Sequence, residues 1–187
     1  STTITLLAGS SISGMGQGKT IIQWTGSGGG IMFEYDSGQV IPAFTSSHIT
    51  IRDLRLLSSS VAVTGIKVTA GGFETIENVF FAGITTPLNF QGGFRPSIRN
   101  VLCSGSGSNS TGGSIFYRLP HLDIDGYTSY NTCGQTAVLT FTRIAAATVS
   151  NVNLYSPGVI GILLDDDCQG VGISNSVMTG VTHGISL

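Results

Sequence analysis

Two short apolar patterns alternate along the chain, and each recurs at a nearly constant spacing. The first has an apolar residue, a polar residue, an Asn, Asp or Gly, and then usually a second apolar residue. Its six copies are Ile51-Arg52-Asp53-Leu54, Ile76-Glu77-Asn78-Val79, Ile98-Arg99-Asn100-Val101, Ile124-Asp125-Gly126-Tyr127, Val149-Ser150-Asn151-Val152 and Ile173-Ser174-Asn175-Ser176. Their third positions are 25, 22, 26, 25 and 24 residues apart. A period of about two dozen residues is typical of a solenoid, in which each repeat forms one coil.

The second pattern lies between the copies of the first and has an alternation of its own. Its six copies are Ile66-Lys67-Val68, Leu88-Asn89-Phe90, Ile115-Phe116-Tyr117, Leu139-Thr140-Phe141, Ile162-Leu163-Leu164 and Ile185-Ser186-Leu187. A weaker earlier coil uses Ile21 to Trp24 and Ile31 to Glu34. Two strand patterns that recur in fixed order predict coils that each contribute one strand to each of two sheets.

The chemistry of the repeat agrees with stacked strands. A polar residue between two apolar ones has the period of two that a strand buried on one side requires. Asn, Asp and Gly tolerate a left-handed backbone, so the third position predicts a sharp bend. We therefore expect an all-β protein, a parallel β-helix of about seven coils that occupies residues 1–187 as a single segment.

The composition argues against several classes of function. The 187 residues include 27 Gly, only 10% are charged, and the formal net charge is −2. This balance argues against a general nucleic-acid surface, which needs a clustered positive field. No apolar run approaches the length of a membrane span, and we expect neither membrane insertion nor a signal peptide. The three cysteines have neither zinc-site nor disulfide-framework spacing, so no metal is assigned to them.

The regular bends carry a resemblance to a known family. The chain resembles the right-handed parallel β-helix, pectate-lyase-like superfamily, in which such residues form a ladder at one corner. Residues 1–24 look like the first coils of phage tailspikes. The ladder residues are Asp53, Asn78, Asn100, Asn151 and Asn175.

The resemblance implies a function at a virion or an extracellular surface. We expect a tail appendage of the tailspike type, a homotrimer that recognises, and in some members cleaves, a bacterial surface polysaccharide. Two alternatives remain open: a secreted monomeric polysaccharide lyase or hydrolase, and a structural shaft or adhesin segment without catalytic activity.

Stacking converts equivalent positions into columns of side chains. Arg52, Glu77, Arg99 and Asp125 form one outward column, interpreted as a structural salt ladder, with a ligand groove as the alternative. On the other sheet, Phe116 and Leu163 are expected to face outward and to form a subunit interface or a platform for sugar rings. The expected glycan-contacting column on that sheet is Glu34, Gln91, Arg118 and Asp165, with Asp166 and Asp167 beside it, and Phe116 is a further expected contact.

Three adjacent carboxylates, Asp165, Asp166 and Asp167, form the densest acidic cluster. Glycoside hydrolysis needs two carboxyl groups about 5 to 10 Å apart. Asp165 with Asp167, or either of them with Asp123 or Glu74 on another coil, would satisfy this spacing, and Asp165 and Asp167 are the catalytic candidates. Calcium binding there would require further oxygen ligands, so no cofactor is assigned. The alternative is a solvated loop.

Overall fold

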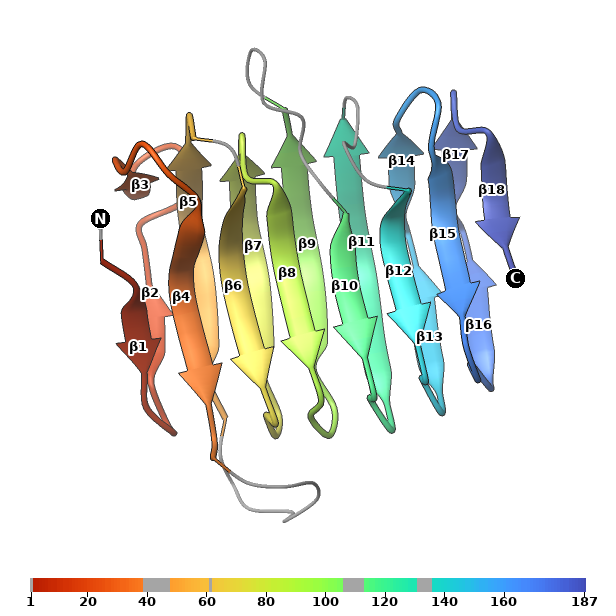
Figure 1. The fold of residues 1–187 in the computed structure, drawn as a ribbon, viewed down its shortest axis with the longest axis horizontal. Helices are drawn as coiled ribbons and strands as arrows, with labels where there is room; N and C mark the ends of the chain where they lie inside the picture. The colour runs from red at the N-terminus through yellow and green to blue at the C-terminus, as the bar shows by residue number, and fades with distance from the viewer. Residues whose placement is uncertain (1, 39–47, 61, 106–112, 131–135) are drawn as a thin grey trace.

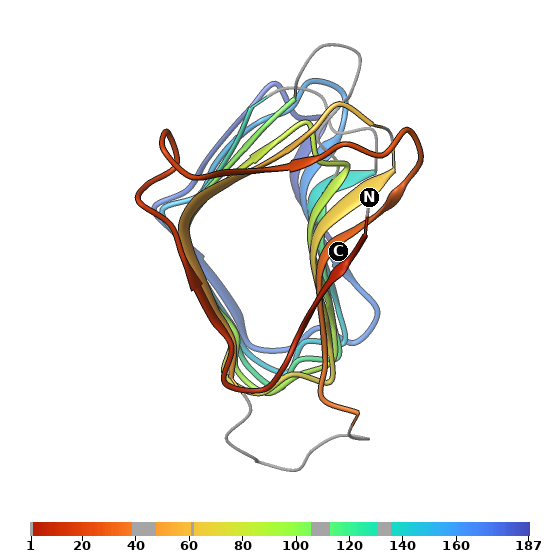
Figure 2. The ribbon, with the colours of Figure 1, turned by 90° about the vertical axis from the view of Figure 1, so that its left-hand side faces the viewer.

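The computed structural model describes residues 2–38, 48–60, 62–105, 113–130 and 136–187. These residues form a parallel β-solenoid of about six turns, and none of them is in a helix. The coils follow one another along a rod from the N-terminus to the C-terminus (Figure 1). Viewed along the rod, the coils superpose around a single interior (Figure 2). The predicted fold class is therefore confirmed.

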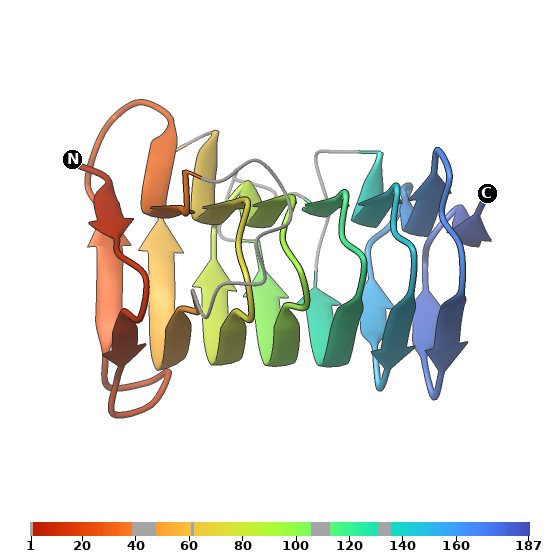
Figure 3. The same cartoon turned by 90° about the horizontal axis from the view of Figure 1, so that it is seen from below.

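Sheet A has eight strands, and every neighbouring pair in it is parallel. Each strand pairs with the equivalent strand of the next coil, so the order in space follows the order in sequence (Figure 3). The strands are β1 (Ile4–Leu6), β4 (Gly30–Asp36), β6 (Val63–Thr69), β8 (Thr86–Gln91), β10 (Ser114–Tyr117), β12 (Ala137–Thr142), β15 (Ile160–Asp165) and β18 (His183–Ser186).

Sheet B lies across the interior from sheet A and is also parallel throughout. In order of sequence, its strands are β2 (Ser11–Ser13), β3 (Ile21–Trp24), β5 (Thr50–Ser58), β7 (Thr75–Ala82), β9 (Ser97–Ser104), β11 (Leu122–Tyr130), β13 (Ala147–Ser150), β14 (Asn153–Tyr155), β16 (Val171–Ser174) and β17 (Val177–Thr179). In the first coil and the last two, two short strands occupy the place of one long strand, because β2 and β3 both pair with β5, while β14 and β17 continue the row of β11.

The interior is filled by inward columns of apolar side chains. Ile51, Ile76, Ile98 and Ile124 align across β5, β7, β9 and β11, and each is at most 1% exposed. On sheet A, the ring of Phe116 lies 5.6 Å from that of Phe90 and 5.5 Å from that of Phe141. Such columns bury equivalent residues against each other, so each coil supplies part of its neighbour's core.

A column of left-handed residues bends sheet B. The third position of every repeat has a positive φ: 59° at Asp53, 52° at Asn78, 49° at Asn100, 78° at Gly126, 54° at Asn151 and 48° at Asn175. Asn78 Nδ2 donates to Asp53 Oδ1 at 3.0 Å. Gly126 interrupts the side-chain ladder, and Asn151 Nδ2 donates instead to Asp125 Oδ1 at 2.7 Å.

A second left-handed column lies where sheet A turns toward sheet B. Its members are Ala70, Gly92, Arg118, Arg143 and Asp166. The backbone N–H of each of the first four donates to a carbonyl group of the next coil, as from Arg118 to Thr142 at 3.0 Å. This corner was not predicted, because Ala and Arg have no preference for a left-handed backbone.

The prediction that Phe116 faces outward is wrong. Phe116 is fully buried, because β10 begins with the inward Ser114, and Ile115 occupies the outward column with Asn89 and Thr140. A shift of one residue moves every side chain of a strand to the opposite face. Leu163 does lie in the outward column, paired with Thr140, and is half-buried.

Two other residues of the expected glycan column also lie outside it, Glu34 by a shift of two residues along the outward face and Arg118 by a shift of one. Glu34 pairs in register with Lys67, and their side chains form an ion pair at 2.8 Å, so Glu34 is not in the column of Gln91. Arg118 lies just beyond β10 at the corner, and Tyr117 takes its place beside Gln91.

Candidate functional site

The corner at the Asn ladder divides the outer surface of sheet B into two facets. We call the half before the corner the polar facet; its outward residues are Thr50, Arg52, Thr75, Glu77, Ser97, Arg99, Asp123, Asp125, Thr148 and Ser150. We call the half after it the apolar facet, after its large apolar side chains Ile21, Leu57, Phe80, Leu102, Tyr130, Tyr155 and Val177; Gln23, Arg55, Ser104, Thr128, Asn153 and Thr179 also face outward there. Because the strands are parallel and in register, each facet continues from coil to coil.

The polar facet contains a hollow of about 300 Å³, which we call the polar hollow. It extends across β9, β11 and β13, whose outward side chains supply most of its lining. The lining residues are Ser97, Ile98, Arg99, Asp123, Ile124, Asp125, Thr148 and Ser150. Hydroxyl, carboxylate and guanidinium groups thus surround one shallow space, with the strand backbone as its floor.

Asp125 is a fixed hydrogen-bond acceptor in this hollow. Its Oδ1 accepts hydrogen bonds from Ser150 Oγ at 2.9 Å and from Asn151 Nδ2 at 2.7 Å. These two bonds, led by that from Asn151, and the positive charge of Arg99 hold the pKa of Asp125 below its usual value. Asp125 is therefore a carboxylate at neutral pH, suited to accepting hydrogen bonds and poorly suited to donating a proton.

Asp123, the second carboxylate, is held from the side of the preceding turn. Its Oδ2 lies 3.1 Å from Arg95 Nε, and its Oδ1 lies 3.1 Å from His121 Nε2. Arg99, in contrast, has no ion pair within 4.0 Å among the described residues, and its exposed side chain faces solvent. The polar hollow thus combines two positioned acceptors with one cationic donor group that is available to a ligand.

The residues of the expected site on sheet A do not converge on one space as those of the polar hollow do. Asp165, Asp166 and Asp167 are all exposed, and the ion pair of Asp166 with Arg143, at 2.8 Å, raises the pKa of that guanidinium. Gln91 and Asp165 share an outward column but are three coils apart, about 14 Å at the spacing of β-strands. Asp123 lies on β11 of sheet B, and Glu74 lies in the turn just before β7, both on earlier coils than these aspartates.

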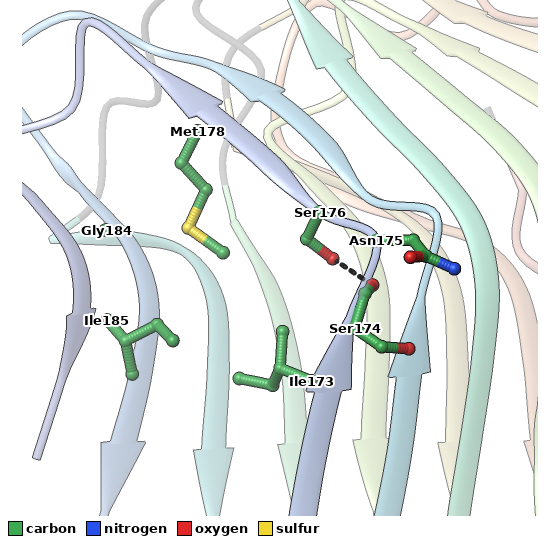
Figure 4. A pocket seen from close by; sticks show the side chains of 7 residues that line it. All are labelled: Ile173, Ser174, Asn175, Ser176, Met178, Gly184 and Ile185. Carbon is green, nitrogen blue, oxygen red and sulfur yellow. Dashed lines mark hydrogen bonds between the residues drawn. The ribbon is translucent and has the colours of Figure 1, made fainter.

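A second hollow, of about 440 Å³, lies at the C-terminal end of the rod between β16, β17 and β18 (Figure 4). Its apolar lining consists of Ile173, Met178 and Ile185, which continue the inward columns of the preceding coils. Ser176 Oγ donates to the Ser174 carbonyl at its rim, at 2.8 Å. This hollow is the inward face of β16, β17 and β18, and no charged side chain lines it.

Among the described residues, no group of three or more His, Cys, Asp and Glu side chains is placed to hold a metal ion. Cys103 is buried, with its Sγ 3.2 Å from Tyr127 Oη, and Cys168 is half-buried; neither is in a disulfide, while Cys133 lies outside the described residues. The described part of the chain also has no helix long and apolar enough to cross a membrane.

The chain was compared with known protein families, curated proteins and solved structures, and none of them matches it significantly.

The polar hollow coincides with the column that sequence reasoning interpreted as a salt ladder. Arg52, Glu77, Arg99 and Asp125 do align in register. However, no ion pair within 4.0 Å joins Glu77 to either arginine in the described residues. The sequence pattern that could have indicated the hollow is the neighbouring outward column of Ser97, Asp123 and Thr148, because these polar residues line the same space.

Proposed function

We propose that this solenoid is a carbohydrate-recognising segment of a phage tail appendage of the tailspike type, which binds a bacterial surface polysaccharide through the polar facet of sheet B. The observation that carries the proposal is the polar hollow, where Arg99, Asp123 and Asp125 converge on one space of about 300 Å³. The location would be the virion surface.

The side chains of the hollow match what a sugar offers. Adjacent hydroxyl groups of a pyranose donate to carboxylates and accept from guanidinium groups, and charge-assisted hydrogen bonds of this kind are stronger than neutral ones. The hydroxyls of Ser97, Thr148 and Ser150 add groups that both donate and accept. A rod with equivalent columns in successive coils also suits an extended polymer, which can contact several coils at once.

The chemistry of the hollow favours binding over cleavage. A glycosidase needs one carboxylic acid that retains its proton, with a raised pKa. The pKa of Asp125 is lowered, and Asp123 is occupied by Arg95 and His121. We therefore propose recognition in this hollow without a bond-breaking step.

The appendage would be a homotrimer, and the apolar facet supports this part of the proposal. Tyr130, Tyr155 and Val177 are 44%, 43% and 59% exposed on one continuous outward surface. Arg55 is the only charged side chain among the facet residues named above, and it lies over the ring of Phe80 at 4.6 Å. A surface with several exposed apolar side chains, next to a polar one, would let other copies of the chain cover it while the polar facet stays accessible.

The function is tested on an array of purified bacterial capsular and O-antigen polysaccharides. The native protein should bind a subset of them, and Arg99→Ala should weaken that binding by about tenfold or more, because it removes charge-assisted hydrogen bonds worth about 1.5–3 kcal/mol. Arg52→Ala is the matched control, because it removes the same side chain from the same column outside the hollow. Equal losses from both arginines, or no binding by the native protein, would contradict the proposal.

A further inference from the structure

Two phenylalanines on adjacent coils form an aromatic pair beside the polar hollow. Each follows two glycines, in Gly71-Gly72-Phe73 and Gly92-Gly93-Phe94. Their ring centroids are 5.2 Å apart with an interplanar angle of 71°. Phe73 is 46% exposed and Phe94 is half-buried, so the pair presents an apolar surface to solvent at the turn leading into sheet B.

The aromatic pair and the polar hollow are continuous. Arg95, the residue after Phe94, holds Asp123 of the hollow through its Nε at 3.1 Å. On the next coil, the backbone N–H of His121 donates to the Phe94 carbonyl at 3.2 Å, and the His121 ring contacts Asp123. One surface therefore runs from Phe73 through Phe94 and Arg95 into the hollow, across the four coils of β7, β9, β11 and β13.

This surface has no excess of positive charge. Arg95 and Arg99 contribute two positive charges, whereas Glu77, Asp123 and Asp125 contribute three negative ones. A polyanionic polysaccharide would gain little from such a surface, because complementary recognition of a polyanion requires an excess of positive charge. Acceptors and donors together suit the hydroxyl groups of a neutral sugar, whose C–H face is apolar.

We infer that this surface binds a neutral hexose polymer, with Phe73 and Phe94 against the apolar face of one sugar ring and the polar hollow around the hydroxyl groups of its neighbours. The inference rests on the proposed function and names its substrate class. The glycan would lie along the rod axis, because the aromatic pair and the hollow follow one another from coil to coil. Phe73 would then be a specificity-determining contact, selecting sugars with an unsubstituted apolar face.

Phe73 also has a structural explanation that the test must separate. It adjoins Glu74, which is fully buried and accepts a hydrogen bond from the Gly72 backbone N–H. If Phe73 only covered this carboxyl group, its removal would change stability and leave glycan binding intact. The variants are therefore compared at temperatures at which each is fully folded.

The experiment measures binding to neutral and acidic polysaccharides on the same array, at low and at high salt. The native protein should prefer neutral polymers, and salt should affect binding little because few net charges are involved. Phe73→Ala should bind about fivefold to tenfold more weakly, as expected for loss of one aromatic contact, and Phe73→Tyr should retain native binding.

Two results would overturn the inference and leave the proposed function standing. One is unchanged binding by Phe73→Ala while Arg99→Ala binds weakly; the other is preference for acidic polymers with steep loss of binding in salt. If the native protein bound no polysaccharide, both the inference and the proposed function would fall.

Discussion

Glu74 is a carboxyl group in an unusual environment. It is fully buried, its Oε1 accepts from the Gly72 backbone, and its Oε2 has no hydrogen-bond partner among the described residues. Burial raises its pKa, against smaller lowering effects that include the Gly72 hydrogen bond and the charge of His48. Burying an incompletely paired carboxylate is costly, and this desolvation is the largest cause of the raised pKa.

A dependence of stability on pH follows from this shift. The folded protein binds the Glu74 proton more tightly than the unfolded chain does, so this group's contribution to stability is fully present below the unfolded pKa of about 4.3 and is lost as pH rises through the folded pKa. We expect Glu74→Gln to remove that loss. Thermal unfolding of both proteins should show the native protein losing more stability than the variant between acid and neutral pH; parallel curves would contradict the role of Glu74.

At the scale of single residues, sequence reasoning fails where a strand is apolar on both faces. Ile115-Phe116-Tyr117 offers no alternation by which to assign a face. Phe116 packs inward because Ser114 and Phe116 align with the inward columns of β8 and β12, which is a matter of register with neighbouring coils. The sequence does mark Phe73, because Gly-Gly-Phe occurs twice. That repeat indicates a binding residue only if the turn is exposed, which the sequence alone does not show.

At the scale of elements, the corner at the Asn ladder depends on backbone conformation as much as on side-chain hydrogen bonds. Asn100 has a φ of 49°, and its side chain makes no hydrogen bond to another described residue of the kind that joins Asn78 to Asp53. The following member is Gly126, which has no side chain at all. The common requirement of the column is therefore tolerance of a left-handed conformation.

Two substitutions at Asn100 separate the backbone requirement from the side chain. Asn100→Ala and Asn100→Gly both remove the amide, but only Gly accepts positive φ without strain. We expect Ala to lower the free energy of unfolding by about 1 kcal/mol and Gly to lower it by less. Chemical denaturation of the three proteins measures this difference. If Gly destabilised the protein more than Ala, the corner would depend on something other than backbone conformation.

The need for a left-handed backbone explains why the sequence predicted one corner and not the other. The ladder corner uses Asn, Asp and Gly at nearly equal spacing, so residue identity alone marks it. The second corner places Ala70, Arg118 and Arg143 at positive φ, although none of these residue types favours it. Hydrogen bonds to the next coil hold those residues, as from Arg143 N to the Asp166 carbonyl at 2.8 Å, and such bonds exist only in the assembled stack.

At the scale of the molecule, the two facets of sheet B separate the proposed binding surface from the proposed subunit contact. The fold, the period and the ladder corner were predictable because each repeats in the sequence. The facets were not, because they combine outward positions from several coils on either side of the bend. Arg99 and Tyr155 are both outward residues of sheet B, yet they lie on different facets.

Self-association through the apolar facet is tested by the mass of the protein in solution. The native chain, of 19.3 kDa, should scatter light as a trimer. Tyr155→Glu should shift it to the monomer, because it buries a charge in an apolar contact. Thr140→Glu, on the outer face of sheet A, should leave the trimer unchanged. A monodisperse native monomer at high concentration would refute the proposed contact.

The in-register ladder corner also governs where the chain can change length. Between successive corners the spacing varies from 22 to 26 residues, yet the residues just before each corner pair one to one, as Thr75 to Glu77 do with Ser97 to Arg99. If Asn100 kept its place at the corner, one extra residue between Arg99 and Asn100 would turn Arg99 inward and expose Ile98. Insertions and deletions are therefore confined to the turns between the sheets, whereas loss or duplication of a whole coil would preserve every column along the rod.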